Sequence, residues 1–283
     1  MVTFKKENRE LCYVAARHEN SIRSSTFQLV EGTFDSFAPQ ILILEGFYYA
    51  CGKSPPWLLD SLKGEEGKAH WKGGEVHFAA FLAHKKGIDF VGAEPEDREI
   101  LTQLQSIGFT VEDFCFFYFL RNIPQYFRSK ELSSEDQLQS LFERDMQRWK
   151  EHGLLQSIPT YSDYQEWFFR NASSRVSFKK LVKHDLTVPE LDSQLFLHQL
   201  SREIESIRDT HILKVQLDLF QEFNKIMVVY GASHYPCQKE VLQRYFGDPV
   251  YLRGISSWWP FRKKAKTAKE FFKSYQRSKI FLV

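Results

Sequence analysis

Apolar and polar segments alternate along the chain in a pattern that predicts strands and helices in turn. Short apolar runs bounded by polar residues are typical of buried strands. Such runs occur at Leu11–Ala16, Ile41–Leu44, Ile88–Ala93, Ile226–Tyr230 and Val250–Leu252. Between the first two runs, Phe27, Val30, Phe34 and Phe37 form an apolar stripe at helical spacing. The resulting order β-α-β predicts two parallel strands joined by a crossover helix.

The middle of the chain lacks a strand pattern, and residues 110–223 have helical spacing. We therefore predict an α/β fold: a mostly parallel or mixed central sheet flanked by helices, with a large helical insertion between the third and fourth core strands. Residues 1–109 and 224–255 would form the sheet core and residues 110–223 the insertion, within a single domain. Residues 51–74 are rich in Gly, Pro and Lys, which predicts a loop, and a helix is expected from Glu75.

The amino-acid composition indicates the class of protein but says little about the reaction that it would catalyse. The 26 Phe residues predict a core with much aromatic packing. The four Cys are widely spaced without a C-x-x-C pair, which argues against a disulfide framework or a zinc knuckle. There is neither a signal-peptide pattern nor an apolar run of roughly 20 residues, the length of a membrane-spanning helix. We expect a cytoplasmic protein, while a delivered effector would show the same pattern.

Basic residues gather at the C-terminus of a chain whose formal net charge is +2. Residues 261–283 contain eight Lys or Arg and a single acid, Glu270. Five apolar or aromatic residues there share one helical face, from Phe261 to Tyr275. We interpret residues 256–283 as a basic amphipathic helix that packs on its own domain. Contact with a membrane surface is the alternative, and no specific nucleic-acid partner is expected.

Polar residues recur directly after the predicted strands. His18 follows the first strand, Glu45 the second, Glu94 the third and His234 the fourth. Because ligands of open parallel sheets bind beyond the carboxyl ends of the strands, these residues are expected to converge. Imidazole and carboxylate groups suit a divalent metal ion. The alternative is an acid and a base on either side of a substrate.

Four segments resemble motifs of the TraB/Tiki superfamily. They are Val14–His18, Leu44–Gly46, Gly73–Ala79 and Val228–His234. This superfamily includes pheromone-shutdown proteins, Tiki metalloproteases, erythromycin esterases and haem-binding ChaN-like proteins. Its hallmarks are two distant G-x-x-H motifs, a Glu after the second strand, a Glu on a helix and an Arg on a late helix.

The resemblance extends to individual positions. The segment Gly231-Ala-Ser-His234 matches the second G-x-x-H motif, and Glu45 matches the Glu after the second strand. Glu75 stands at the position of the helical Glu and Arg208 at that of the late Arg. The first motif departs from the family, because Ala15 stands where Gly is usual.

The resemblance implies a hydrolase that cleaves a peptide or ester bond, assisted by a divalent ion (Mn, Co or Zn). His18, His234 and Glu45 would hold the ion. Glu45 or Glu75 would be the general base, and Arg208 would anchor the substrate, a peptide or small molecule. Asp209, next to Arg208, would orient a residue that binds the ion or the substrate without binding either itself.

Two alternatives stay open. A metal-free variant would use His18 or His234 directly as the base. A non-catalytic protein of the same fold would bind haem, another small molecule or a protein partner instead.

Overall fold

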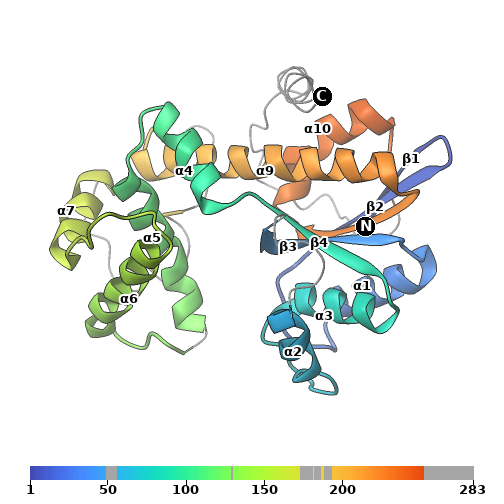
Figure 1. The fold of residues 1–283 in the computed structure, drawn as a ribbon, viewed down its shortest axis with the longest axis horizontal. Helices are drawn as coiled ribbons and strands as arrows, with labels where there is room; N and C mark the ends of the chain where they lie inside the picture. Colours follow the sequence, from blue (N-terminus) through green and yellow to red (C-terminus); the bar gives the residue numbers. More distant parts are fainter. Residues whose placement is uncertain (49–55, 129, 173–180, 182–185, 188–192, 252–283) are drawn as a thin grey trace. The chain divides into compact units, whose positions relative to one another are not determined.

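The structure is a computed structural model that describes residues 1–48, 56–128, 130–172, 181, 186, 187 and 193–251 (Figure 1). The chain divides into two compact units, one formed by Met1–Glu96 with Arg208–Val283 and the other by Asp97–Ile207. We call them the sheet unit and the helical unit. The helix predicted at residues 256–283, with its proposed membrane contact, lies outside the described residues.

The sheet unit contains a six-stranded mixed sheet with strand order β4-β3-β5-β2-β1-β6. The strands are β1 (Val2–Lys6), β2 (Arg9–Ala16), β3 (Ile41–Tyr48), β4 (Asp89–Glu94), β5 (Lys225–Gly231) and β6 (Val250–Tyr251). Strands β4, β3, β5 and β2 are parallel, whereas β1 is antiparallel to both β2 and β6. The predicted α/β class with a mixed sheet flanked by helices is confirmed.

Helices cover both faces of this sheet (Figure 1). They are α1 (Ser25–Phe37), α2 (Pro56–Lys63), α3 (Gly74–Lys85), α10 (His234–Phe246) and the part of α9 (Phe196–Glu222) that begins at Arg208. Met227 and Val229 of β5 pack toward α1 and α3. Ile226 and Val228 of the same strand pack toward α9 and α10, as expected when alternate side chains of a strand point to opposite faces.

Two local predictions were wrong. Residues 56–63 form helix α2 within the segment predicted to be a loop; proline at its first position suits a helix start, since that N–H has no intrahelical partner. Strand β3 also continues beyond Glu45 and Gly46, with a shift of register relative to β4 after Leu44. Gly46 adopts a φ of 80°, a conformation in which glycine is favoured.

Close packing of β3 and β4 at this irregularity depends on a second glycine. A Cβ atom added to Gly92 would lie 1.9 Å from the backbone oxygen of Phe47. Only a residue without a side chain therefore allows the two strands to pass here. The irregularity lies directly beside Glu45 and so determines where the backbone places this side chain.

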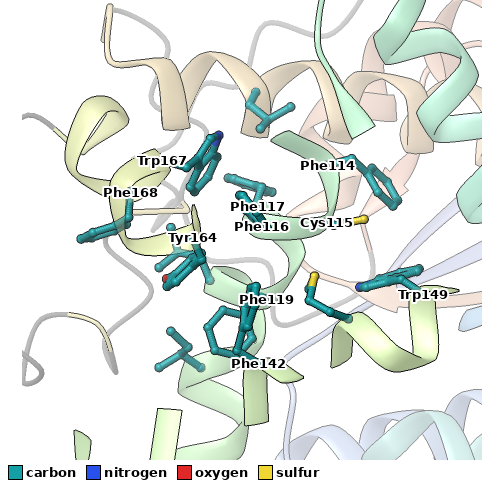
Figure 2. Packing of buried hydrophobic residues seen from close by; sticks show 14 of the residues in the cluster. Phe114, Cys115, Phe116, Phe117, Phe119, Phe142, Trp149, Tyr164, Trp167 and Phe168 are labelled. Atoms are coloured by element: carbon teal, nitrogen blue, oxygen red, sulfur yellow. The ribbon is translucent and has the colours of Figure 1, made fainter. Parts of the chain in front are cut away.

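The helical unit is built around aromatic side chains (Figure 2). Its helices are α4 (Asp97–Ser106), α5 (Val111–Arg128), the short 3₁₀ helix η2 (Glu135–Gln137), α6 (Leu138–Glu151), α7 (Tyr161–Asn171) and the first part of α9. The ring of Phe119 meets the rings of Phe142 and Tyr164 edge to face, at centroid distances of 5.2 and 5.0 Å. Such T-shaped contacts add to the stabilisation from burial. None of the described helices has the length and apolar character needed to cross a membrane.

Candidate functional site

His18 lies just beyond β2 and is held by a carboxylate of helix α3. The Nδ1–H of His18 donates to Oε1 of Glu75 at 2.8 Å, and the backbone N–H of Glu19 donates to Oε2 at 3.1 Å. Glu75 is buried in the first turn of α3, while the His18 ring is largely exposed. The hydrogen bond to Glu75 raises the pKa of His18 above its usual value, outweighing partial burial. Glu75 thus fixes the ring and leaves its Nε2 directed toward the sheet.

His234 is the buried counterpart of His18. It is the first residue of α10, and only 2% of it is exposed. Its Nδ1–H donates to Oδ1 of Asp209 on α9 at 2.7 Å. Burial alone would lower the pKa of His234, but Asp209 and Glu45 outweigh burial and raise this pKa to about 10. The ring is therefore a buried cation between two carboxylates.

Glu45 lies between the two histidines. Its Oε2 accepts the backbone N–H of Gly231 at 2.5 Å and lies 4.0 Å from Nε2 of His18, while its Oε1 lies 3.4 Å from Nε2 of His234. Burial opposes ionisation of Glu45, but His234, His18 and Arg208 lower its pKa to about 2. Gly231 leaves room for both groups, because an added Cβ would lie 2.9 Å from Nε2 of His18 and 3.0 Å from Oε2 of Glu45 and would displace these side chains.

Arg208 has a carboxylate partner of its own. Its Nε and Nη2 donate to the two oxygens of Glu94, at the end of β4, at 2.9 and 3.0 Å. The same Nη2 lies 3.9 Å from Oε1 of Glu45. This forked pair is the strong geometry for a guanidinium and a carboxylate. Arg208 is therefore a positive charge close to Glu45, and its Nε and Nη2 are already hydrogen-bonded to Glu94.

The structure brings together every site residue that the sequence singled out. His18, Glu45, Glu75, Arg208 and His234 all lie in the sheet unit and are connected by the contacts above. The acids predicted beside them join as well: Glu94 pairs with Arg208, and Asp209 holds His234. The sequence analysis did not predict two buried glutamines, Gln216 and Gln238, that extend the hydrogen bonding of Asp209. Gln238 lies one helical turn after His234.

Three of the described residues lie close enough together to hold a metal ion. Glu205, Asp209 and His234 each offer a ligand atom within 4.8 Å of the others, and Glu205 precedes Asp209 by one turn of helix α9. Two of these atoms already have partners, since Oε1 of Glu205 lies 2.7 Å from Nη1 of Arg121 and Oδ1 of Asp209 accepts from His234. An ion at this position would have to replace them.

A second ligand set consists of Nε2 of His18, Nε2 of His234 and the carboxylate of Glu45. Ligand atoms around a tetrahedral ion such as zinc lie roughly 3.4 Å apart, from bond lengths near 2.1 Å. The 3.4 Å between Glu45 and His234 has this spacing, and the 4.0 Å between Glu45 and His18 is slightly wider. These two spacings involve different oxygens of Glu45, and the two Nε2 atoms with a single Glu45 oxygen do not all lie within 4.8 Å of one another. The exposed His18 ring would therefore have to move closer for the three side chains to hold one ion.

Comparison with known proteins does not assign the chain to a family. No protein-family model matches it, and no similar protein was found among curated proteins or solved structures. The resemblance to the TraB/Tiki superfamily therefore rests on the sequence motifs alone and stays a prediction.

Proposed function

We propose that this protein is a metal-assisted hydrolase that cleaves an acyl bond in a peptide or an ester. One observation carries the proposal: two histidines, each anchored at Nδ1 by a buried carboxylate, direct their Nε2 atoms to the two oxygens of Glu45. Metal-binding histidines commonly donate their other ring N–H to a carboxylate in this way. Two imidazoles and one carboxylate are also a common ligand set for catalytic divalent ions.

In this proposal His18, His234 and Glu45 hold the ion, which when bound would polarise a carbonyl or lower the pKa of water. Glu75 and Asp209 keep the two rings in the tautomer that leaves Nε2 available. His234 contributes most to keeping Glu45 ionised, and His18 and Arg208 add to its effect. Glu75 accepts hydrogen bonds at both oxygens, which favours a supporting role over that of a general base.

The charge state of His234 favours this proposal over a reaction in which that ring is the base. Neighbouring carboxylates raise the pKa of both rings, that of His234 to about 10. A protonated imidazole cannot accept a proton from water or substrate, so His234 is a poor general base at neutral pH. A metal ion would displace the Nε2 protons, and its affinity should increase with pH.

The first test is metal binding by the full-length protein after treatment with a chelator. Calorimetric titration with Zn²⁺, Co²⁺ or Mn²⁺ should show one ion bound per chain, with binding lost in His234→Ala and weakened in Glu45→Gln. His152→Ala, an exposed histidine of the helical unit, is the matched control and should bind like the wild type. A wild type without metal binding would overturn the metal-assisted mechanism.

Two further variants distinguish the possible ligand sets. His18→Ala should abolish binding if Glu45 and the two histidines hold the ion. Glu205→Gln should abolish it if Glu205, Asp209 and His234 hold it instead. The metal-loaded protein would then be assayed with peptide and ester libraries. Stoichiometric metal without turnover of either class would support the alternative of a non-catalytic binding protein.

A further inference from the structure

Two buried glutamines extend the hydrogen-bond network behind His234. Nε2 of Gln238 donates to Oδ1 of Asp209 at 2.8 Å, the oxygen that also accepts from His234. Nε2 of Gln216 in turn donates to Oε1 of Gln238 at 2.9 Å. Both glutamines are 0% exposed. Bulk water therefore does not compete for these hydrogen bonds in the folded protein.

The positions of these residues on their helices explain how the network forms. His234 and Gln238 are four residues apart on α10, and Asp209 and Gln216 are seven apart on α9. Each pair consequently lies on one face of its helix. Polar side chains of the α9 face thus meet polar side chains of the α10 face within an otherwise apolar core.

The direction of the hydrogen bonds follows from the charge of Asp209. An ionised carboxylate only accepts hydrogen bonds, so Gln238 must present its N–H₂ group to Asp209 and its carbonyl to Gln216. The carbonyl oxygen of Gln216 has no hydrogen-bond partner among the described residues, and the network can be followed no further within them. Gln238 is the member that touches Asp209, and Gln216 only orients the amide of Gln238.

We propose that Gln238 is a positioning residue of the metal centre, which holds the Asp209 carboxylate so that His234 presents Nε2 to Glu45. Its effect on metal affinity rests on the proposed function, whereas its effect on the His234–Asp209 hydrogen bond does not. Groups that support a metal ligand from behind typically change metal affinity 10- to 100-fold when mutated, an order of magnitude that we adopt here.

The test uses Gln238→Met, which keeps the length of the side chain but removes the donor. We expect the Zn²⁺ affinity of the full chain to fall about 10- to 100-fold. Gln216→Met should have a smaller effect, because it leaves the contact with Asp209 in place. Gln221→Met is the matched control. Gln221 lies on α9, the helix of Gln216, but it is exposed and its side chain donates to Tyr245 instead.

A double-mutant cycle separates positioning from general damage to the fold. If Gln238 acts through Asp209, Gln238→Met should not weaken Zn²⁺ binding further when Asp209→Ala is already present. A purely structural role would lower the affinity by the same factor in both backgrounds. Additive losses would therefore overturn the proposal.

A measurement without metal keeps the inference independent of the hydrolase proposal. The proton on Nδ1 of His234, hydrogen-bonded to Asp209, should give a downfield ¹H NMR resonance in the metal-free protein. This resonance should shift or broaden in Gln238→Met and stay unchanged in Gln221→Met. An unchanged resonance in Gln238→Met would overturn the positioning role. If the wild type binds no metal but the resonance responds, the proposed function fails and the positioning of His234 stands.

Discussion

Replacing Asp209 by Asn tests whether the charge behind His234 stabilises the protein. The Asn oxygen can still accept from His234 and Gln238, which lie 2.7 and 2.8 Å from Oδ1 of Asp209. Hydrogen bonds to a charged group contribute about 1.5–3 kcal/mol and neutral ones about 0.5–1.5 kcal/mol. Losing about 1 kcal/mol at each of two bonds lowers the free energy of unfolding by about 2 kcal/mol at pH 6.

The size of this loss should depend on pH in a defined direction. The pKa of His234 is raised from 6.5 to about 10 in the folded protein. Protonation of His234 therefore contributes stability that is fully present below pH 6.5 and is lost as the pH rises toward 10. Asp209→Asn lowers the folded-state pKa, so the difference between wild type and variant should be largest at pH 6 and shrink toward pH 10. The slope is at most about 1.4 kcal/mol per pH unit for one proton.

Other site carboxylates do not obscure this window. Glu45 has a folded pKa of about 2 against an ordinary value of 4.5, so its contribution is present above pH 4.5 and is lost only as the pH falls toward 2. It is constant between pH 6 and 10. His18, whose pKa is also raised above 6.5, is present in both proteins, so the pH dependence of the difference between wild type and Asp209→Asn should report on His234.

The assay must follow the sheet unit by itself. Cys12 lies in β2 and is 1% exposed, so it reacts with a methanethiosulfonate only when this unit unfolds. Pulsed labelling across a urea series at pH 6 and pH 9.5, read by mass spectrometry, gives the free energy at each pH. The control is Glu222→Gln, because Glu222 is an exposed acid at the end of α9, the helix that carries Asp209. Equal destabilisation at both pH values would refute the reasoning.

Four further substitutions test other parts of the sheet unit. Gly92→Ala should destabilise the sheet unit by about 3 kcal/mol, because its Cβ would meet the Phe47 backbone at 1.9 Å. Gly32→Ala on α1, with nothing within 4 Å, should instead stabilise it by about 1 kcal/mol in the same urea assay. Glu75→Gln should lower the pKa of His18, since the hydrogen bond that His18 donates to Glu75 is the main cause of its increase; NMR titration of the ring measures this, and an unchanged pKa would contradict the assigned contact. Tyr230→Phe should keep the melting temperature or raise it, because the buried hydroxyl has no hydrogen-bond partner in the part of the chain that the structure describes, and a marked decrease would reveal one.

The sequence by itself determined the class of fold and most of its elements. Apolar runs bounded by polar residues predicted the core strands, because hydrophobic periodicity is a local property of the chain. Strand β1 was missed, since Val2 and Phe4 make too short an alternation to distinguish from a polar terminus. These two side chains are fully buried in the structure, a consequence of pairing with β2 and β6.

The sequence predicted His18, Glu45, Glu94 and His234 from their places after the strands, and Glu75 and Arg208 from the resemblance to the TraB/Tiki motifs. Their convergence could be expected because the carboxyl ends of parallel strands meet at one edge of the sheet. Their individual roles could not be. Arg208 was assigned to the substrate, but its partner Glu94 stands 114 residues away, and nothing local in either segment predicts that pair.

Only the tertiary structure decided which groups hold the two histidines. Glu75 is 57 residues from His18, and Asp209 is 25 residues from His234. Gln216 and Gln238 join the network because α9 and α10 bring their polar positions together on one face of the sheet. Hydrogen bonds act over about 3 Å in space regardless of separation along the chain. The hydrogen-bond partners of these side chains are therefore determined by the packing of the strands and helices and not by the local sequence.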